Sequence, residues 1–238
     1  VSTEGTANAG AASASYTVIV EQATPTVTVN LPAGGQDRSY GFTGQPLTFT
    51  ATVTGVGNGA VAPTGTDEIT YTFYENGDGE PGQSLGTTQP TAVGTYWVEA
   101  AYGGDNNYKE ATSAAQSFTI SPAQLSVQVL NPYDGKTYDG KAHNAAADFT
   151  VTGNGQTLTE GVTITYAESA GGEYTGSTMP QVKDAGEYTV YYKVSVPNYG
   201  VYTDDFTVTV KPLEVPLDGE VTKIKTYDRN AEAEVSID

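Results

Sequence analysis

The fold prediction rests first on one stretch of the sequence, Asp184-Ala185-Gly186-Glu187-Tyr188-Thr189-Val190-Tyr191-Tyr192-Lys193-Val194-Ser195-Val196. One face of an extended chain would carry the apolar or aromatic side chains of Tyr188, Val190, Tyr192, Val194 and Val196. The residues between them are mainly polar, which is typical of a β-strand with one buried and one exposed face. We expect a tight turn at Asp184–Gly186 that leads into one long strand.

A second copy of this pattern occurs about ninety residues earlier in the chain. Gly94 aligns with Gly186, and Tyr96 aligns with Tyr188. The further matches are Asn107-Tyr108 with Asn198-Tyr199, Ser117–Ile120 with Asp205–Val208, and Lys136–Gly140 with Lys225–Arg229. This spacing suits consecutive sandwich domains better than a solenoid, whose repeats span about 20 to 50 residues.

The repeats predict the domain organisation. Residues 24–121 (module 1) and 122–212 (module 2) each hold one complete set of strands, so we expect tandem antiparallel Greek-key β-sandwiches. Residues 1–23 would supply only a closing strand of a preceding repeat or a linker arm, and residues 213–238 only the opening of a further repeat or a C-terminal arm. No window of helical length has a convincing 3.6-residue apolar period, so the predicted fold class is all-β.

Several short motifs resemble those of known families. The Gly-x-Tyr segments ending at Tyr96 and Tyr188 resemble the tyrosine corner of immunoglobulin-like sandwiches, in which the phenol hydroxyl bonds to backbone just upstream. Module 1, with Gly94-Thr95-Tyr96 and Tyr102–Tyr108, resembles the bacterial immunoglobulin-like repeats of the Big type. Module 2, with Tyr138-Asp139-Gly140 and Asn198-Tyr199, is similar to the MBG/YDG-type repeats of bacterial surface proteins. These resemblances imply largely buried corner tyrosines, an extracellular, cell-surface or secreted location, and no family active site.

Composition narrows the possible partners. The chain has 28 acidic and 10 basic residues, with a formal net charge of −18. A field of this sign repels nucleic acid and anionic membranes, so we expect neither as a partner. Cysteine is absent from the sequence, which excludes disulfides, thiolate metal sites and cysteine nucleophiles. No apolar run approaches the roughly 18 residues that a membrane-spanning helix needs.

Three functions agree with these features. The first is a non-enzymatic stalk or adhesive segment that presents something from a bacterial surface, next to other copies or repeats and in contact with a host protein, matrix protein or glycan. The second is a subunit of an extracellular filament assembled by strand exchange. The third is a carbohydrate-binding accessory module of a secreted glycosidase. Trp97→Ala would abolish glycan binding in the third case and change nothing in the first.

The terminal arms bear on the second function. A lone strand such as Tyr16–Val20 would leave its backbone groups and one apolar face unpaired. We therefore expect each arm to dock, either onto the adjacent module or into a neighbouring chain. Donation between chains would join copies head to tail, and such a contact builds a filament when it does not close.

The candidate ligand sites are few. Asn76, Asp78 and Glu80 alternate in a glycine-rich stretch and loosely resemble the first half of a calcium loop, although the bidentate acid that would complete such a loop is missing. A solvated Asn-Gly/Asp-Gly turn explains the same residues, and we expect no cofactor. Trp97, Tyr74 and Tyr191 point away from the predicted cores and are the candidates for contact with a sugar or protein partner.

No catalytic constellation is recognisable. His143 is the single histidine, and the sequence offers it no serine and acid in a triad arrangement. The acids Glu99, Asp184 and Glu187 lie at strand starts or on exposed strand faces, where no cleft would raise the pKa of a general acid. We expect a protein without enzymatic activity.

Overall fold

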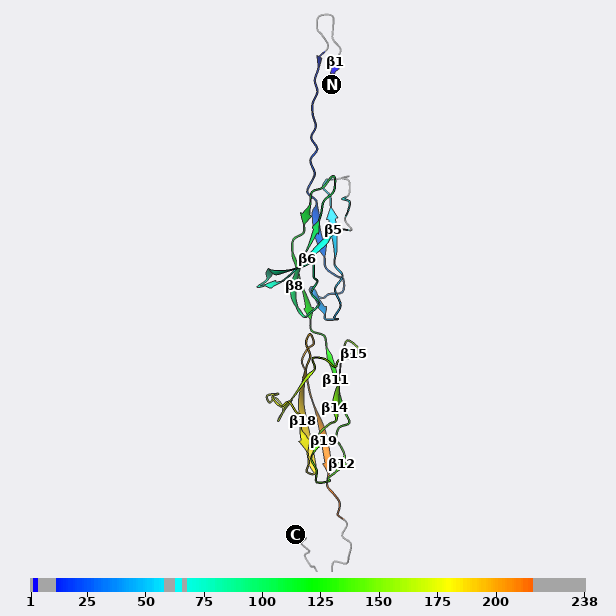
Figure 1. Ribbon diagram of the computed structural model, residues 1–238, viewed down its shortest axis with the longest axis vertical. Coiled ribbons are helices and arrows are strands. Elements are labelled where there is room, and N and C mark those ends of the chain that lie inside the picture. Colours follow the sequence, from blue (N-terminus) through cyan, green and yellow to red (C-terminus); the bar gives the residue numbers. More distant parts are fainter. Residues whose placement is uncertain (1, 4–11, 58–62, 66–67, 216–238) are drawn as a thin grey trace, which may run out of the picture. The chain divides into compact units, whose positions relative to one another are not determined.

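The computed structural model describes residues 2–3, 12–57, 63–65 and 68–215. Every regular element in these ranges is a β-strand, so the all-β prediction is confirmed (Figure 1). The strands form several sheets, and within the described residues no ladder joins a strand of residues 24–121 to a strand of residues 122–212. The described part of the chain also has no helix that could cross a membrane.

Module 1 contains a large sheet and a two-stranded sheet. Its strands are β3 (Thr26–Asn30), β4 (Ser39–Gly41), β5 (Thr50–Thr54), β6 (Thr70–Gly77), β7 (Glu80–Gly86), β8 (Gly94–Tyr102), β9 (Ala111–Thr112) and β10 (Gln116–Ser121). The large sheet has the order β4-β10-β8-β6-β7, with β9 also on β8, and β3 pairs with β5. All of these pairs are antiparallel except β4 with β10, which is parallel.

The core of module 1 lies between these sheets in a sandwich-like arrangement. Val27 and Val29 of β3 are buried, as their alternation with threonine predicts. The ring of Phe49 packs edge to face against Phe73 and Phe118, with centroids 5.5 and 5.0 Å apart. Such aromatic pairs stabilise a core beyond the apolar area that they bury.

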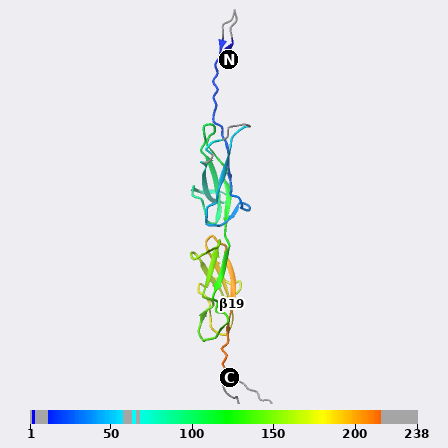
Figure 2. The same ribbon diagram turned by 90° about the vertical axis from the view of Figure 1, so that its right-hand side faces the viewer.

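Module 2 contains three small sheets. Its strands are β11 (Leu125–Leu130), β12 (Lys136–Thr137), β13 (His143–Asn144), β14 (Asp148–Gly153), β15 (Gln156–Thr157), β16 (Thr163–Ala167), β17 (Gln181–Val182), β18 (Gly186–Ser195) and β19 (Tyr202–Lys211). The sheets have the orders β11-β14-β15, β12-β19-β18-β16 and β13-β17, and β19 is drawn in orange in Figure 2. The short β12 runs parallel to β19.

β18 contains most of the predicted long strand, residues 184–196. Val190, Tyr192 and Val194 are buried, while Tyr191 and Lys193 between them are only partly buried. The predicted alternation is therefore confirmed for this strand. It arises because successive side chains of an extended chain point to opposite faces of the sheet.

The two corner tyrosines are less enclosed than expected. The Tyr188 hydroxyl donates to the backbone oxygen of Asp184 at 2.9 Å, four residues upstream. Tyr96 and Tyr188 are both only partly buried, which corrects the expectation that they are largely buried. Each is the third residue of its strand.

The N-terminal arm also differs from the expectation. β1 (Ser2–Thr3) pairs with β2 (Ala12–Ser13), but residues 14–22 form no strand in the described structure. The expected strand Tyr16–Val20 is therefore not formed within this chain. Its large hydrophobic side chains are 69–89% exposed: Tyr16, Val18, Ile19 and Val20. The predicted opening of a further repeat falls mostly in residues 216–238, outside the described residues.

Candidate functional site

The candidate residues of module 1 lie on the outer face of its large sheet. Trp97 of β8 is directly opposite Tyr74 of β6 on one side and Ser117 of β10 on the other. Val98 and Phe118, the sequence neighbours of Trp97 and Ser117, are buried, so Trp97 and Ser117 face away from the core. We call this surface, defined by Tyr74, Asn76, Trp97, Glu99 and Ser117, the Trp97 face.

Four of the five residues of the Trp97 face form two hydrogen-bonded pairs. The indole Nε1–H of Trp97 donates to Asn76 Oδ1 at 3.1 Å, and the Tyr74 hydroxyl donates to Glu99 Oε2 at 2.9 Å. The second bond raises the pKa of Tyr74, because the carboxylate stabilises the protonated phenol. A partner would therefore meet flat, partly buried aromatic surfaces whose hydrogen-bond donors are already used.

The candidate metal loop is a tight hairpin turn. Gly77 pairs with Glu80, which leaves Asp78 and Gly79 as the two turn residues between β6 and β7, with φ of 55° and 94°. Two positive φ values match a type I′ turn, for which Asp-Gly is a preferred sequence. The Oδ1 atom of Asn76 accepts the Trp97 N–H instead of facing a shared cavity. Among the described residues, no three His, Cys, Asp or Glu side chains form a group that could hold a metal ion.

The sequence predicted an Asn-Gly/Asp-Gly turn at Asn76, Asp78 and Glu80 but no strand at β7. The Asp78-Gly79 pair was the available signal, since Asp-Gly between two extended segments is a strong indicator of a hairpin. Tyr191, the third aromatic candidate, lies on the outward face of β18 and shares no sheet with Trp97 and Tyr74. The predicted aromatic contacts therefore do not form one continuous sheet face.

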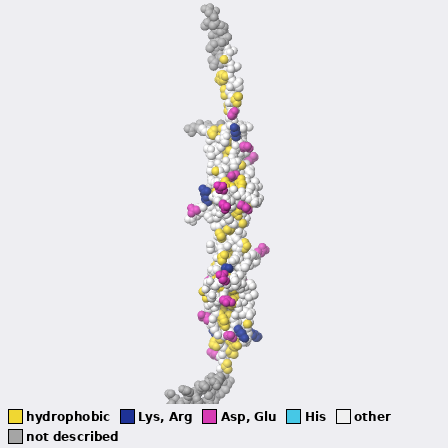
Figure 3. All heavy atoms as spheres, turned by 90° about the vertical axis from the view of Figure 1, so that its left-hand side faces the viewer, with side chains coloured by type: hydrophobic (Ala, Val, Ile, Leu, Met, Phe, Trp, Pro, Cys, Tyr) yellow, Lys and Arg dark blue, Asp and Glu magenta, His cyan; other side chains and the backbone are white. Residues whose placement is uncertain are grey.

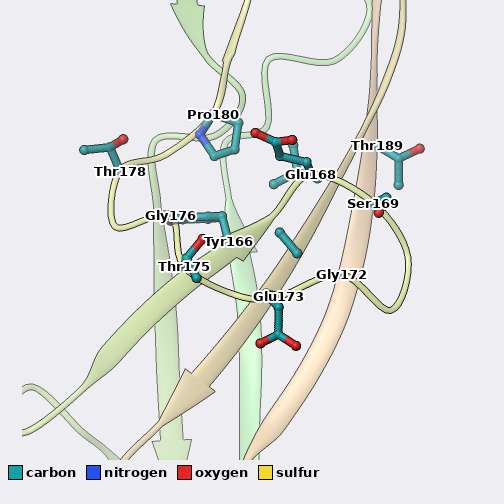
Figure 4. Close-up of a pocket in the computed structure, with 12 residues that line it drawn as sticks. Tyr166, Glu168, Ser169, Gly172, Glu173, Thr175, Gly176, Thr178, Pro180 and Thr189 are labelled. Atoms are coloured by element: carbon teal, nitrogen blue, oxygen red, sulfur yellow. The ribbon is translucent and has the colours of Figure 1, made fainter.

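A cleft that the sequence did not predict lies in module 2 (Figure 4). It has a volume of about 760 Å³ and is bounded by the end of β16, the start of β18 and the intervening loop. Two backbone hydrogen bonds between Tyr166 and Gly176, at 2.9 and 3.1 Å, fold this loop back along β16. No periodic pattern marks a site of this kind, because loop residues supply most of its wall.

The polar groups of this cleft do not converge on one point. Glu168 and Glu173 contribute carboxylates, but these point in different directions, and both residues are exposed (Figure 4). A pair of acids for glycoside hydrolysis would flank one bond at a defined separation. The remaining polar side chains in the wall are hydroxyls, at Tyr166, Ser169, Thr175, Thr178 and Thr189.

The single histidine belongs to a small surface cluster. His143 Nε2 lies 3.0 Å from Asp139, and its ring stacks on Tyr133 with centroids 4.2 Å apart. The backbone N–H of Lys141 donates to Asp139 Oδ1, and this bond, together with His143, lowers the pKa of Asp139. Gly140 follows with φ of 76°, a positive value of the kind that the glycine of an Asp-Gly turn supplies.

Asp105 connects two segments of module 1, its own turn and the segment that holds Thr64. Its carboxylate accepts the backbone N–H and the hydroxyl of Thr64 at 2.7 and 2.9 Å, and the N–H groups of Asn107 and Tyr108 at 2.7 and 2.8 Å. These donors, with the Thr64 N–H as the largest contribution, hold the pKa of Asp105 well below its usual range. Tyr102 extends the link, since its hydroxyl donates to the Thr64 carbonyl at 2.9 Å. This acid therefore has a structural role.

Charged side chains are dispersed rather than gathered. Acidic groups are scattered over the face shown in Figure 3, with few lysines and arginines among them. Such a distribution gives solubility and weak long-range repulsion, not a focused binding site.

In comparisons with known proteins, the chain matches no family model and no curated protein.

Proposed function

We propose that this chain is a non-enzymatic stalk or presentation segment of a secreted or cell-surface bacterial protein. Its two modules would be consecutive immunoglobulin-like Greek-key sandwiches, the first of the Big type and the second of the MBG/YDG type. The observation that carries the proposal is a set of equivalent contacts at aligned positions of the two modules. The same structural contacts occur in both modules, and the described residues form no cluster of reactive side chains. Such a protein is suited to spacing and presentation.

The first equivalent contact anchors the chain as it enters each module. In module 1 the Ala23 N–H donates to the Asn107 carbonyl at 2.9 Å, and the Lys109 N–H donates to the Ala23 carbonyl at 2.8 Å. In module 2 Ala123 makes the corresponding pair of bonds with Asn198 and Gly200, at 3.2 and 2.8 Å. Both anchors use the Asn-Tyr motif that the two modules share in sequence.

The second equivalent contact packs the tyrosine of this motif on a glycine. Tyr108 lies against Gly55, and Tyr199 lies against Gly153, so closely that a Cβ atom on either glycine would collide with the phenol. The two glycines occupy matching places at the ends of β5 and β14. The same pair of residue types therefore supports the entry of the chain in each module.

The direct test of the proposal is location. In cells that make the protein, antibodies raised against residues 24–212 should label intact cells, or detect the chain in the medium, and added protease should remove the signal. The purified chain should show no hydrolysis of a broad panel of glycoside and ester substrates. A chain found only inside intact cells would contradict the proposal.

The exposed N-terminal arm supports a second candidate, a filament subunit. Tyr16 and Val18 align with the buried Phe118 and Ile120 of β10, and Val20 aligns with the buried Val210 of β19, yet all three side chains are 69–89% exposed. Insertion into a module of a second copy would bury them and pair their backbone. Light scattering should then show concentration-dependent assembly of residues 1–238, which removal of residues 1–23 abolishes. A strict monomer in both cases, with unchanged melting temperature, would exclude this candidate.

The Trp97 face supports the third candidate, a carbohydrate-binding module, because exposed aromatic rings can stack on sugars. A glycan panel measured by calorimetry tests this reading. The stalk proposal expects no binding by the native chain and no effect of Trp97→Ala. Millimolar or tighter binding that Trp97→Ala abolishes, and that Tyr191→Ala leaves unchanged, would favour the carbohydrate-binding function instead.

A further inference from the structure

The closing strand of module 1 is held by a short parallel strand. The register pairs Ser39 with Thr119, Tyr40 with Ile120 and Gly41 with Ser121. Two backbone bonds flank this register: the Thr119 N–H donates to Arg38 at 2.9 Å, and the Phe42 N–H donates to Ser121 at 2.8 Å. The Ser121 hydroxyl also donates to the Tyr40 carbonyl at 3.2 Å. We call this element the β4–β10 clamp.

Module 2 has a corresponding element, the β12–β19 clamp. Its register pairs Lys136 with Val210 and Thr137 with Lys211. The Gly135 N–H donates to Thr209 at 2.9 Å, and the Tyr138 N–H donates to Lys211 at 2.8 Å. The Asp134 carboxylate accepts the Thr209 N–H at 2.8 Å, in the place where module 1 uses the Arg38 carbonyl.

The closing strand of each clamp has a buried side. Tyr40 of β4 is buried, and its hydroxyl donates to the Pro32 carbonyl at 2.9 Å. Ile120 of β10 and the two valines of β19, Val208 and Val210, are also buried. β4 and β12 themselves are edge strands of their sheets, and both residues of β12 are exposed.

The parallel direction of the strands decides how these clamps respond to tension. Force on the N-terminal side of a module reaches β4 or β12 at its N-terminal end only after β3 has separated from β5, or β11 from β14. Force on the C-terminal side reaches β10 or β19 at its C-terminal end. Opposed pulls on parallel strands slide them past each other, so all the bonds of the pair share the load. In an antiparallel hairpin such as β6–β7, a pull at the open end would break the bonds one after another.

We propose that the β4–β10 and β12–β19 clamps are the force-bearing elements of the two modules. This inference rests on the proposed function as a stalk, because a stalk transmits tension between its anchor and whatever it holds. Each clamp contains only two or three register pairs, so each of its backbone bonds carries a large share of the resistance.

Single-molecule force spectroscopy on residues 1–238, placed between reference domains and pulled from both ends, tests the proposal. Phe42→Pro removes the N–H that bonds Ser121, whereas the matched control Phe42→Ala keeps it. We expect Phe42→Pro to lower one unfolding-force peak by roughly a third relative to Phe42→Ala, in line with the loss of one bond among a few. In module 2, Asp134→Ala should lower the other peak, and Asp134→Asn, which keeps a carbonyl acceptor, should lower it less.

A variant outside the clamps separates mechanical from general stability. Gly79 has φ of 94° in the β6–β7 turn, so Gly79→Ala strains the hairpin and should lower the urea midpoint. It should leave both force peaks unchanged. Equal force loss in Gly79→Ala and Phe42→Pro would overturn the proposal, as would unchanged peaks in Phe42→Pro and Asp134→Ala.

If Phe42→Pro misfolds, the variants Asp134→Ala and Asp134→Asn still test the proposal, because both retain all backbone donors. The outcome is also separable from the proposed function. Unchanged peaks in a protein found at the cell surface contradict the clamp alone. Strong clamps in a protein confined to the cell interior contradict the stalk function and leave the mechanical assignment in place.

Discussion

At the residue scale, two contacts show how one side chain can organise distant segments. Asp105 joins its own turn to Thr64, which lies 41 residues away in the sequence. Tyr108 has only 3% of its surface exposed, and it packs on Gly55 while its backbone neighbours hold Ala23. Loss of either contact should loosen the same end of module 1.

Asp105→Asn should lower the melting temperature at pH 7, because a neutral amide cannot accept donors at both of its terminal atoms. The pKa of Asp105 is lowered in the folded state, so its contribution to stability is present above the unfolded pKa of about 3.9 and is lost as pH falls through the folded pKa. The difference between native and Asp105→Asn melting temperatures should therefore shrink below about pH 4. A constant difference from pH 7 to pH 2 would contradict this role.

Gly55→Ala should destabilise module 1 by about 1–3 kcal/mol, because the new methyl group collides with Tyr108. Gly153→Ala should have a similar effect in module 2 through Tyr199. Gly103→Ala is the matched control, since a Cβ atom there meets nothing within 4 Å. Urea denaturation of the three variants measures the effect, and equal stability of Gly55→Ala and Gly103→Ala would contradict it.

At the element scale, alternation along a strand separates structural positions from surface positions. In β10, Phe118 is 1% exposed and contacts Phe49, while the preceding Ser117 faces outward beside Trp97. Two adjacent residues of one strand therefore have different roles, and substitutions distinguish them.

Phe118→Ala should cost about 3–5 kcal/mol of unfolding free energy, because it removes a ring at the centre of the aromatic cluster and leaves a cavity. Ser117→Ala should change the free energy by less than about 0.5 kcal/mol, as is usual for surface positions. Denaturant unfolding followed by Trp97 fluorescence reports on module 1 directly. Similar losses in both variants would mean that the register of β10 is wrong.

At the scale of the whole molecule, charge is the dominant general property. A formal net charge of −18 makes the folded chain repel itself, and added salt screens this repulsion. Raising sodium chloride from low to physiological concentration should increase the melting temperature by a few degrees. A decrease would indicate that attractive ion pairs dominate.

The effect of calcium on stability tests for a metal site separately from the general effect of salt. The Asp78-Gly79 turn leaves Asn76, Asp78 and Glu80 along a hairpin rather than around a shared centre. Calcium chloride should therefore stabilise the chain no more than sodium chloride of equal ionic strength. A saturable excess that Asp78→Asn removes would restore the metal-loop interpretation.

Alternation along a strand is a local property, so the sequence alone predicted the long strand β18 and the burial of Val190, Tyr192 and Val194 within it. The Asp-Gly and Asn-Gly turns are local for the same reason, because their positive φ values depend on adjacent residues. Even β7 was readable from Asp78-Gly79, although the sequence analysis missed it.

Which strands pair, in contrast, depends on contacts between distant parts of the chain. β4 and β12 are three and two residues long and have no period to detect, yet they pair in parallel with the closing strands β10 and β19. The burial of Tyr40 and the contact of Asp105 with Thr64 likewise depend on segments distant in sequence. Strand pairing depends on how the whole chain closes its loops around a core, so it cannot be predicted from any single stretch of residues.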